Sequence, residues 1–151
     1  MLAWIIFALV VALVLWVRFA PNEPARWHVD PAVVTKTAKP NQFLMRDGGD
    51  APAELFDLPP EDLAAALHEI AVAQPRVTVL AEDASDFWIT YEQRSKLMGY
   101  PDFISVRIIP GAGGKSAVQI YSRSRFGKSD LGVNKARVTH WLRLLRAAVA
   151  G

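Results

Sequence analysis

The sequence predicts an α+β fold in which an N-terminal transmembrane helix precedes an antiparallel sheet of about four strands with two helices on one face. Three observations support this prediction. An uncharged run opens the chain, four runs of alternating polarity follow one another at short spacing, and two segments carry apolar residues at helical spacing. We expect a membrane anchor at residues 1–19, an extended proline-rich lead-in at 20–59 and an α+β domain at 60–151.

The anchor is predicted from residues 1–17, which contain no charged side chain and end just before Arg18. As a helix this run measures about 25 Å, close to the thickness of the hydrocarbon core of a bilayer. Trp4 and Trp16 lie near its two ends, where interfacial aromatic residues are enriched. A cleavable signal peptide has a basic start and a cleavage site of small residues, and this run has neither. The sequence therefore favours a retained single-pass anchor whose partner is the lipid bilayer.

The rest of the chain divides into a lead-in and two predicted helices. Residues 20–60 hold seven of the ten prolines and the Gly48-Gly49 pair, which is typical of extended chain. Pro60 suits the first position of a helix, and apolar residues at helical spacing extend that helix over 60–73. The same spacing predicts a last helix over 131–150.

Four strands are predicted at 76–81, 87–95, 103–109 and 117–125, and the turns between them are short enough to require antiparallel pairing. Because side chains alternate between the two faces of a strand, one sheet face gathers aliphatic residues such as Val106 and Ile120. We expect both helices to cover this face. The other face gathers Arg94, Arg107, Arg123, Glu92 and Tyr121, and we expect it to face water as a cationic patch.

Charge is distributed unevenly along the chain. Residues 1–86 hold six Lys or Arg against twelve Asp or Glu, whereas residues 87–151 hold eleven against three. A basic half of this kind favours an anionic partner such as a lipid headgroup, a phosphorylated ligand or an acidic protein, and a membrane anchor makes nucleic acid the least expected of them. The chain has no cysteine and three scattered histidines, so we expect no disulfide, metal or cofactor.

The stretch Ser122–Arg137 joins the fourth strand to the last helix and is the strongest candidate for a functional site. It combines three arginines, two lysines, three serines and two glycines. Backbone N–H groups at a helix start, with cations beside them, form an anion site. The alternative is a well-capped turn in which Ser129 or Asp130 accepts the exposed N–H groups and the arginines remain in solvent.

Two motifs resemble a known bacterial family, the domain-of-unknown-function family numbered 1499. Arg94-Ser95 matches an Arg-Ser element of that family. The second motif, Ser-Arg-x-Gly-x-Ser-Asp-x-Gly-x-Asn-x-x-Arg, matches residues Ser124–Arg137 at every specified position. The resemblance covers roughly residues 38–148. Many members carry a Pro-Asn-Cys segment, which is Pro-Asn-Gln here, so a role of that cysteine is absent from this chain.

The resemblance also indicates on which side of the membrane the domain lies. Arg18, Arg26, Lys36 and Lys39 follow the anchor, and by the positive-inside rule they favour a cytoplasmic domain. Many members of the family are membrane-anchored or envelope proteins, which implies a domain in the periplasm. We expect an inner-membrane protein with a periplasmic domain.

The function expected from these features is that of a non-catalytic, membrane-anchored accessory or binding domain with an Arg-rich surface for an anion or partner. Such a domain could belong to a larger membrane complex. A second interpretation is a purely structural subunit that binds no ligand. The alternative is an envelope hydrolase acting on a lipid or cell-wall substrate, with Ser129, Asp130 and His140 as its only candidate catalytic groups. The candidate binding residues are Arg94, Ser95, Arg107, Arg123, Arg125, Gly127, Ser129, Asp130, Asn134 and Arg137.

The anchor prediction has a direct test. Because no processing signal precedes Arg18, we predict that residues 1 to about 19 stay on the mature protein. The intact mass of the protein extracted from membranes measures this. A product that begins after residue 20 would show instead that the segment is a removed signal sequence.

Overall fold

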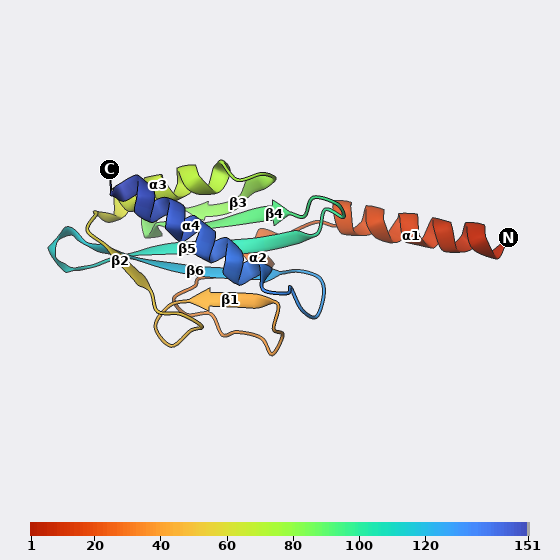
Figure 1. The fold of residues 1–151 in the computed structure, drawn as a ribbon, viewed down its shortest axis with the longest axis horizontal. Helices are drawn as coiled ribbons and strands as arrows, with labels where there is room; N and C mark the ends of the chain where they lie inside the picture. The colour runs from red at the N-terminus through yellow and green to blue at the C-terminus, as the bar shows by residue number, and fades with distance from the viewer. Residues whose placement is uncertain (151) are drawn as a thin grey trace.

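In the computed structural model, which describes residues 1–150, an antiparallel sheet carries two helices on one face and helix α1 (Leu2–Phe19) projects away from it (Figure 1). Among these residues α1 is the one helix long and apolar enough to cross a membrane, a test that a signal sequence also passes. Val17 is its only buried residue. Its side chains therefore project into the surroundings, as those of a lipid-facing helix do.

The sheet has six strands rather than the four predicted. They are β1 (Gln42–Met45), β2 (Glu54–Phe56), β3 (Val77–Asp83), β4 (Trp88–Arg94), β5 (Pro101–Pro110) and β6 (Ser116–Ser124). The order is β1-β6-β5-β4-β3, and β2 also pairs with β6. Consecutive strands from β3 to β6 pair antiparallel, as the short turns predicted.

The two additional strands come from residues 20–59, where the sequence predicted an extended lead-in. Both pair with the free edge of β6, β1 along residues 120–123 and β2 along residues 116–118. Runs of four and three residues are too short to show a strand period, and their partner lies far along the chain. Local pattern therefore could not reveal them.

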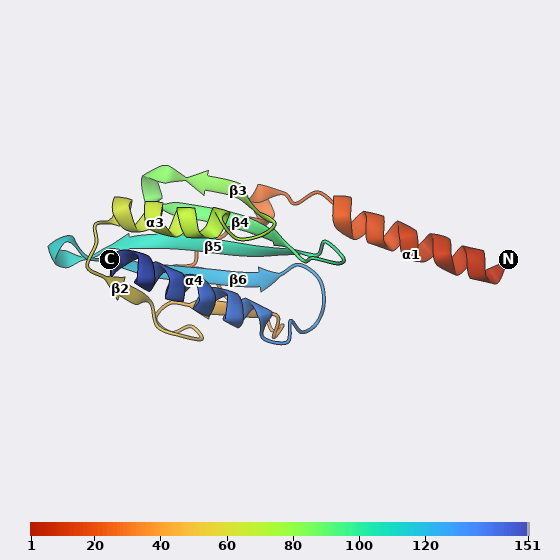
Figure 2. The same cartoon turned by 45° about the horizontal axis from the view of Figure 1, so that its top comes forward.

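The two helices cover the aliphatic face of the sheet, as predicted. Helix α3 (Pro60–Val72) contacts β3 and β5, and α4 (Val133–Val149) contacts β6 and β1 (Figure 2). Val106 and Ile120 on the sheet are buried together with Leu67 and Trp141 on the helices. Helix α4 runs away from α1, so the two chain ends lie at opposite ends of the molecule (Figure 1).

The other face of the sheet, predicted to face water, is covered by residues 18–30, which we call the connecting segment. Trp27 lies at the end of the short helix α2 (Pro24–Trp27) and stacks on Phe103, with ring centroids 4.2 Å apart. His28 stacks on Trp88 at 3.7 Å. The outer face carries Trp88, Phe103 and Tyr121, and burying that aromatic area against the segment is more favourable than hydrating it.

Several polar groups beneath the connecting segment are paired with one another. His28 Nδ1 lies 2.8 Å from Thr90 Oγ1, which in turn lies 2.8 Å from Ser105 Oγ. The indole nitrogen of Trp88 donates to the carbonyl of Val29 at 3.2 Å. Burial lowers the pKa of His28 despite Asp83 and Asp30 nearby, which keeps its imidazole neutral for stacking. These contacts make the segment an integral layer of the fold.

We predict that Trp27→Ala lowers the free energy of unfolding by about 3 kcal/mol, because it removes a buried aromatic side chain and leaves a cavity. Chemical denaturation of the full chain in detergent, followed by circular dichroism, measures this. Val33→Ala is the control, since Val33 is 76% exposed and should change stability by less than about 0.5 kcal/mol. Equal effects of the two substitutions would mean that the segment does not stabilise the domain.

Candidate functional site

Two arginines of the outer face hold the connecting segment through its backbone. Arg94 Nη1 donates to the carbonyls of Arg18 at 2.8 Å and Gly99 at 3.1 Å, and its Nε pairs with Glu92 at 2.5 Å. Arg125 Nη1 donates to the carbonyl of Pro21 at 3.0 Å and to the side-chain oxygen of Asn22. These carbonyls accept no hydrogen bond from the backbone of a helix or strand, so each guanidinium supplies the donor that water would otherwise provide.

Arg107 is separated from the other outer-face arginines by the register of the sheet. Arg107 lies opposite Gln119 on β6, four residues from Arg123, which is about 13 Å along a strand. Its guanidinium pairs with Asp30 of the connecting segment and with Asp86 at 3.2 Å. The charge of Arg107 is thus neutralised within the chain.

Arg123 and Arg125 meet two cations of the predicted lead-in around a pocket of about 230 Å³, which we call the outer pocket. The ten lining residues are Arg26, Trp27, Thr37, Lys39, Asn41, Gln42, Tyr121, Arg123, Ser124 and Arg125. Four of them are cationic and none is acidic. The guanidinium carbon of Arg123 lies 4.8 Å from the ring centre of Trp27 and 5.0 Å from that of Tyr121. The pocket therefore combines positive charge with aromatic walls.

The electrostatics of Arg123 are unfavourable without a counter-ion. Burial lowers the pKa of its guanidinium; Tyr121 opposes this effect and the charge of Arg26 adds to it. Its Nη2 donates to the carbonyls of Arg26 and Trp27 at 3.3 and 3.2 Å, but its buried Nε has no partner among residues 1–150. Since arginine stays protonated in proteins, Arg123 remains a partly buried cation without a carboxylate partner among residues 1–150.

The family motif of the last turn forms a buried polar network at the start of α4. Asn134 is completely buried, and its amide nitrogen donates to the carbonyl of Asn41 at 3.0 Å, to Ser124 Oγ at 3.1 Å and to Asp130 at 2.7 Å. Its amide oxygen accepts from Ser122 Oγ at 2.7 Å. Asn134 thereby joins the residue before β1, strand β6, helix α4 and the turn before α4.

Arg137 extends this network to β4 and β5. It pairs with Asp102 at 2.6 Å, with both side chains largely buried, and donates to Gln93 Oε1 at 2.6 Å. It also donates to Ser122 Oγ at 3.0 Å and to Asn134 Oδ1 at 2.8 Å. Every contact of Arg137 is internal, which gives this motif residue a structural role.

Asp130 accepts the exposed N–H groups at the start of α4, as predicted, although Gly132 occupies the capping position itself. Its carboxylate accepts from the backbone nitrogens of Gly132 at 3.1 Å and Asn134 at 2.8 Å. Burial acts to raise the pKa of Asp130, but these hydrogen bonds and the Asn134 amide hold it below its ordinary value. Ser129 Oγ accepts from the backbone nitrogen of Leu131 at 3.3 Å.

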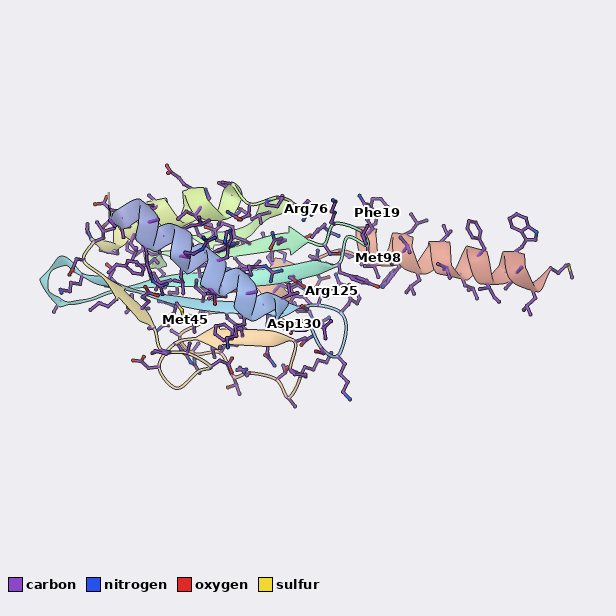
Figure 3. The ribbon with its side chains drawn as sticks, viewed as in Figure 1. Phe19, Met45, Arg76, Met98, Arg125 and Asp130 are labelled. Atoms are coloured by element: carbon purple, nitrogen blue, oxygen red, sulfur yellow. The ribbon has the colours of Figure 1, made fainter. Side chains whose placement is uncertain are left out.

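The ten predicted binding residues therefore do not form one site. Arg123 and Arg125 line the outer pocket, and Arg107 is paired apart from them. Ser95, Gly127, Ser129 and Asp130 line a second pocket of about 310 Å³ beside the start of α4. Arg94 lines a third, next to the end of α1, and Ser95 borders that pocket too. Asn134 and Arg137 belong to the buried network. Figure 3 shows Arg125 and Asp130 at the end of the domain nearest α1.

The candidate catalytic groups do not meet. Within residues 1–150 neither Ser129 nor Asp130 hydrogen-bonds to His140, whose Nδ1 lies 3.0 Å from an Arg143 nitrogen. Asp130 is occupied by helix N–H groups instead of orienting an imidazole. In the same part of the chain no cluster of three or more His, Cys, Asp or Glu is placed to hold a metal ion.

Comparison with known proteins identifies the family of this chain. The family described as "Protein of unknown function (DUF1499)" matches the chain over residues 32–145. The chain belongs to this family. The resemblance recognised in the sequence is thereby confirmed, and the DUF1499 match begins within the stretch that was expected to be a lead-in.

No curated protein matches this DUF1499 chain. Among solved structures, the crystal structure of a DUF4468 family protein from Bacteroides ovatus ATCC 8483 is similar at a TM-score of 0.30 and 10% identity, covering 73% of this chain and 68% of that one. A likeness this distant carries no argument about fold or function.

The sequence favours packing of the lead-in onto the domain through Trp27, Phe43 and Leu44, but sequence reasoning missed that Trp27 covers the outer face and lines the outer pocket with Arg26 and Lys39. One signal for it was present. A sheet face that holds Trp88, Phe103 and Tyr121 is too aromatic to remain exposed, and the lead-in contains large apolar residues such as Trp27 that could cover it. Aromatic residues on a face assigned to solvent therefore indicate a missing layer.

We predict that Asp130→Ala lowers the free energy of unfolding by about 1 kcal/mol at neutral pH, as expected for loss of a helix cap. A carboxyl whose pKa is lower in the folded state than in the unfolded state stabilises the fold when the pH is above its unfolded-state pKa, near 3.9. This stabilisation is lost as the pH falls through the folded-state pKa. The stability difference between parent and variant should therefore shrink below about pH 4. Denaturation curves over a pH series measure it.

The matched control is Asp57→Ala, which removes an exposed acid paired with Lys115 at the surface. Such pairs contribute less than about 1 kcal/mol. A pH-independent loss in Asp130→Ala would show that the carboxylate charge is not what caps α4.

Proposed function

We propose that this chain is a membrane-anchored, non-catalytic binding domain that holds an anionic ligand in its outer pocket. In this proposal α1 is a single span of the inner membrane and the domain lies in the periplasm. The ligand carries a phosphate or carboxylate group, because planar guanidinium groups recognise both through paired hydrogen bonds.

The observation that carries the proposal is the composition of the outer pocket, which has four cationic side chains, two aromatic rings and no acid. Like charges brought together repel, and in a partly buried site water screens that repulsion incompletely. Elsewhere on the same face the arginines have carboxylates as partners: Glu92 for Arg94, and Asp30 and Asp86 for Arg107. Within residues 1–150 no carboxylate pairs with Arg26, Lys39, Arg123 or Arg125, in contrast to Arg94 and Arg107.

The location of the pocket links a bound ligand to the anchor. Arg26 and Trp27 belong to the connecting segment, which follows α1, and Arg123 donates to both of their carbonyls. A ligand that draws these cations together would also stabilise the attachment of the segment to the sheet. Because α1 exposes nearly all its side chains, a larger membrane complex, with this chain as an accessory subunit, is a compatible setting.

We predict that inorganic phosphate or pyrophosphate raises the melting temperature of the full chain in detergent, since a ligand that binds only the folded state stabilises it. In the double variant Arg26→Gln/Lys39→Gln this rise should be largely lost. These two residues are chosen because neither forms an ion pair in residues 1–150, so the fold should remain intact.

The matched control is Lys135→Gln/Arg143→Gln, which removes one lysine and one arginine that are exposed on α4, on the other face of the sheet. It should keep the full response to phosphate. If both double variants responded like the parent, or if the parent showed no rise at all, the outer pocket would not be an anion site.

A further inference from the structure

A second group of cations surrounds the point where α1 leaves the domain. Arg18, Phe19, Arg76, Arg94, Lys96 and Gly99 are among the residues that line a pocket of about 330 Å³ there, which we call the exit pocket. No acid lines this pocket. Glu92, which is not a lining residue, pairs with Arg94 Nε at 2.5 Å. None of Arg18, Arg76 and Lys96 forms an ion pair within residues 1–150.

Hydrogen bonds to the backbone link three of these residues. Arg76 adopts a left-handed conformation with φ of 59°, which is unfavourable for a residue with a side chain. In this conformation its Nε donates to the carbonyl of Arg94 at 2.8 Å, while the Arg94 nitrogen donates to the carbonyl of Arg76 at 3.1 Å. Arg94 in turn donates to the carbonyl of Arg18. The cations are therefore held beside one another by the fold.

The exit pocket lies where a phospholipid headgroup would lie if α1 spans a bilayer. The turn between β4 and β5 reaches the level of the last turn of α1 in both views (Figures 1 and 2). Figure 3 labels Arg76, Met98 and Phe19 at the end of the domain from which α1 projects. Leu97 at the tip of the turn is 86% exposed and Phe19 is 73% exposed, so apolar side chains flank the charged pocket.

We propose that the exit pocket binds the phosphate of an anionic phospholipid in the leaflet from which the domain emerges, with Leu97 and Phe19 against its acyl chains. Four cations without a lining acid match an anionic headgroup, and adjacent apolar side chains match the chains attached to it. A soluble phosphate would satisfy the cations but leave Leu97 in water. This inference rests on the proposed function in one respect, namely that α1 is retained as a membrane span.

The test uses the full chain in nanodiscs of phosphatidylcholine with and without phosphatidylglycerol, followed by native mass spectrometry of the lipids that remain bound in mild detergent. The parent should retain phosphatidylglycerol in preference to phosphatidylcholine. Each basic residue near a membrane surface contributes about fivefold to binding of anionic lipid, so Arg76→Gln/Lys96→Gln should weaken retention roughly 25-fold. Arg94 is left unchanged because it also holds the connecting segment.

Three measurements make the outcome decisive. Lys135→Gln/Arg143→Gln on α4 should retain lipid like the parent, which controls for net charge. Both variants should melt like the parent in phosphatidylcholine alone, which shows that they are folded. Inorganic phosphate should fail to displace the lipid, and displacement would overturn the proposal in favour of a soluble anion.

A second readout follows the position of the turn, using the absence of cysteine from the chain. A polarity-sensitive dye on Leu97→Cys should report a less polar environment when phosphatidylglycerol is present, whereas the same dye on Leu55→Cys should not change. Leu55 is also exposed, at 58%, but lies on β2 at the end of the sheet remote from α1 (Figure 1).

Equal retention of lipid by the parent and Arg76→Gln/Lys96→Gln, with α1 shown to be present by intact mass, would refute the lipid site and leave the anchor in place. Loss of residues 1–20 from the mature chain would refute the membrane anchor, and with it the lipid site that depends on the anchor.

Discussion

The contact between the outer face of the sheet and the connecting segment determines how the domain is attached to α1. Trp27 supplies the apolar part of this contact by stacking on Phe103, and Arg94, Arg123 and Arg125 supply the polar part by donating to backbone carbonyls. The segment has little secondary structure of its own, so its carbonyls need donors from elsewhere. The arginines meet this need and fix the start of the domain relative to the end of α1.

The family motif serves a related purpose on the inner side of the sheet. Asn134 and Arg137 tie the start of α4 to three strands and to the residue before β1 through hydrogen bonds that are buried or partly buried. Such a network is costly to leave partly satisfied, which explains why it needs specific residue types at fixed spacing. In this chain the motif determines the position of α4 and of the turn before it.

The cations do not gather on one sheet face, although the sequence predicted that arrangement. Carboxylates neutralise Arg107, Arg137 and Arg146 within the fold, and each of these pairs stabilises a junction between elements. Other cations, which form no ion pair within residues 1–150, line the outer pocket and the exit pocket, whereas Arg46, Lys128, Lys135 and Arg143 lie outside both. Both pockets include residues of the connecting segment, so the sites proposed for anions lie at the part of the domain that follows α1.

The sequence by itself determined the anchor-like helix, both long helices, four strands and their inner face, because each depends on local spacing of apolar residues. It also identified the family, through a motif whose residues are close in the chain. Only the tertiary structure decided that β1 and β2 complete the sheet, that Trp27 covers Phe103, and that Arg26 and Lys39 join Arg123. These contacts join residues up to about a hundred positions apart, and no period within a single segment encodes which distant partner it meets.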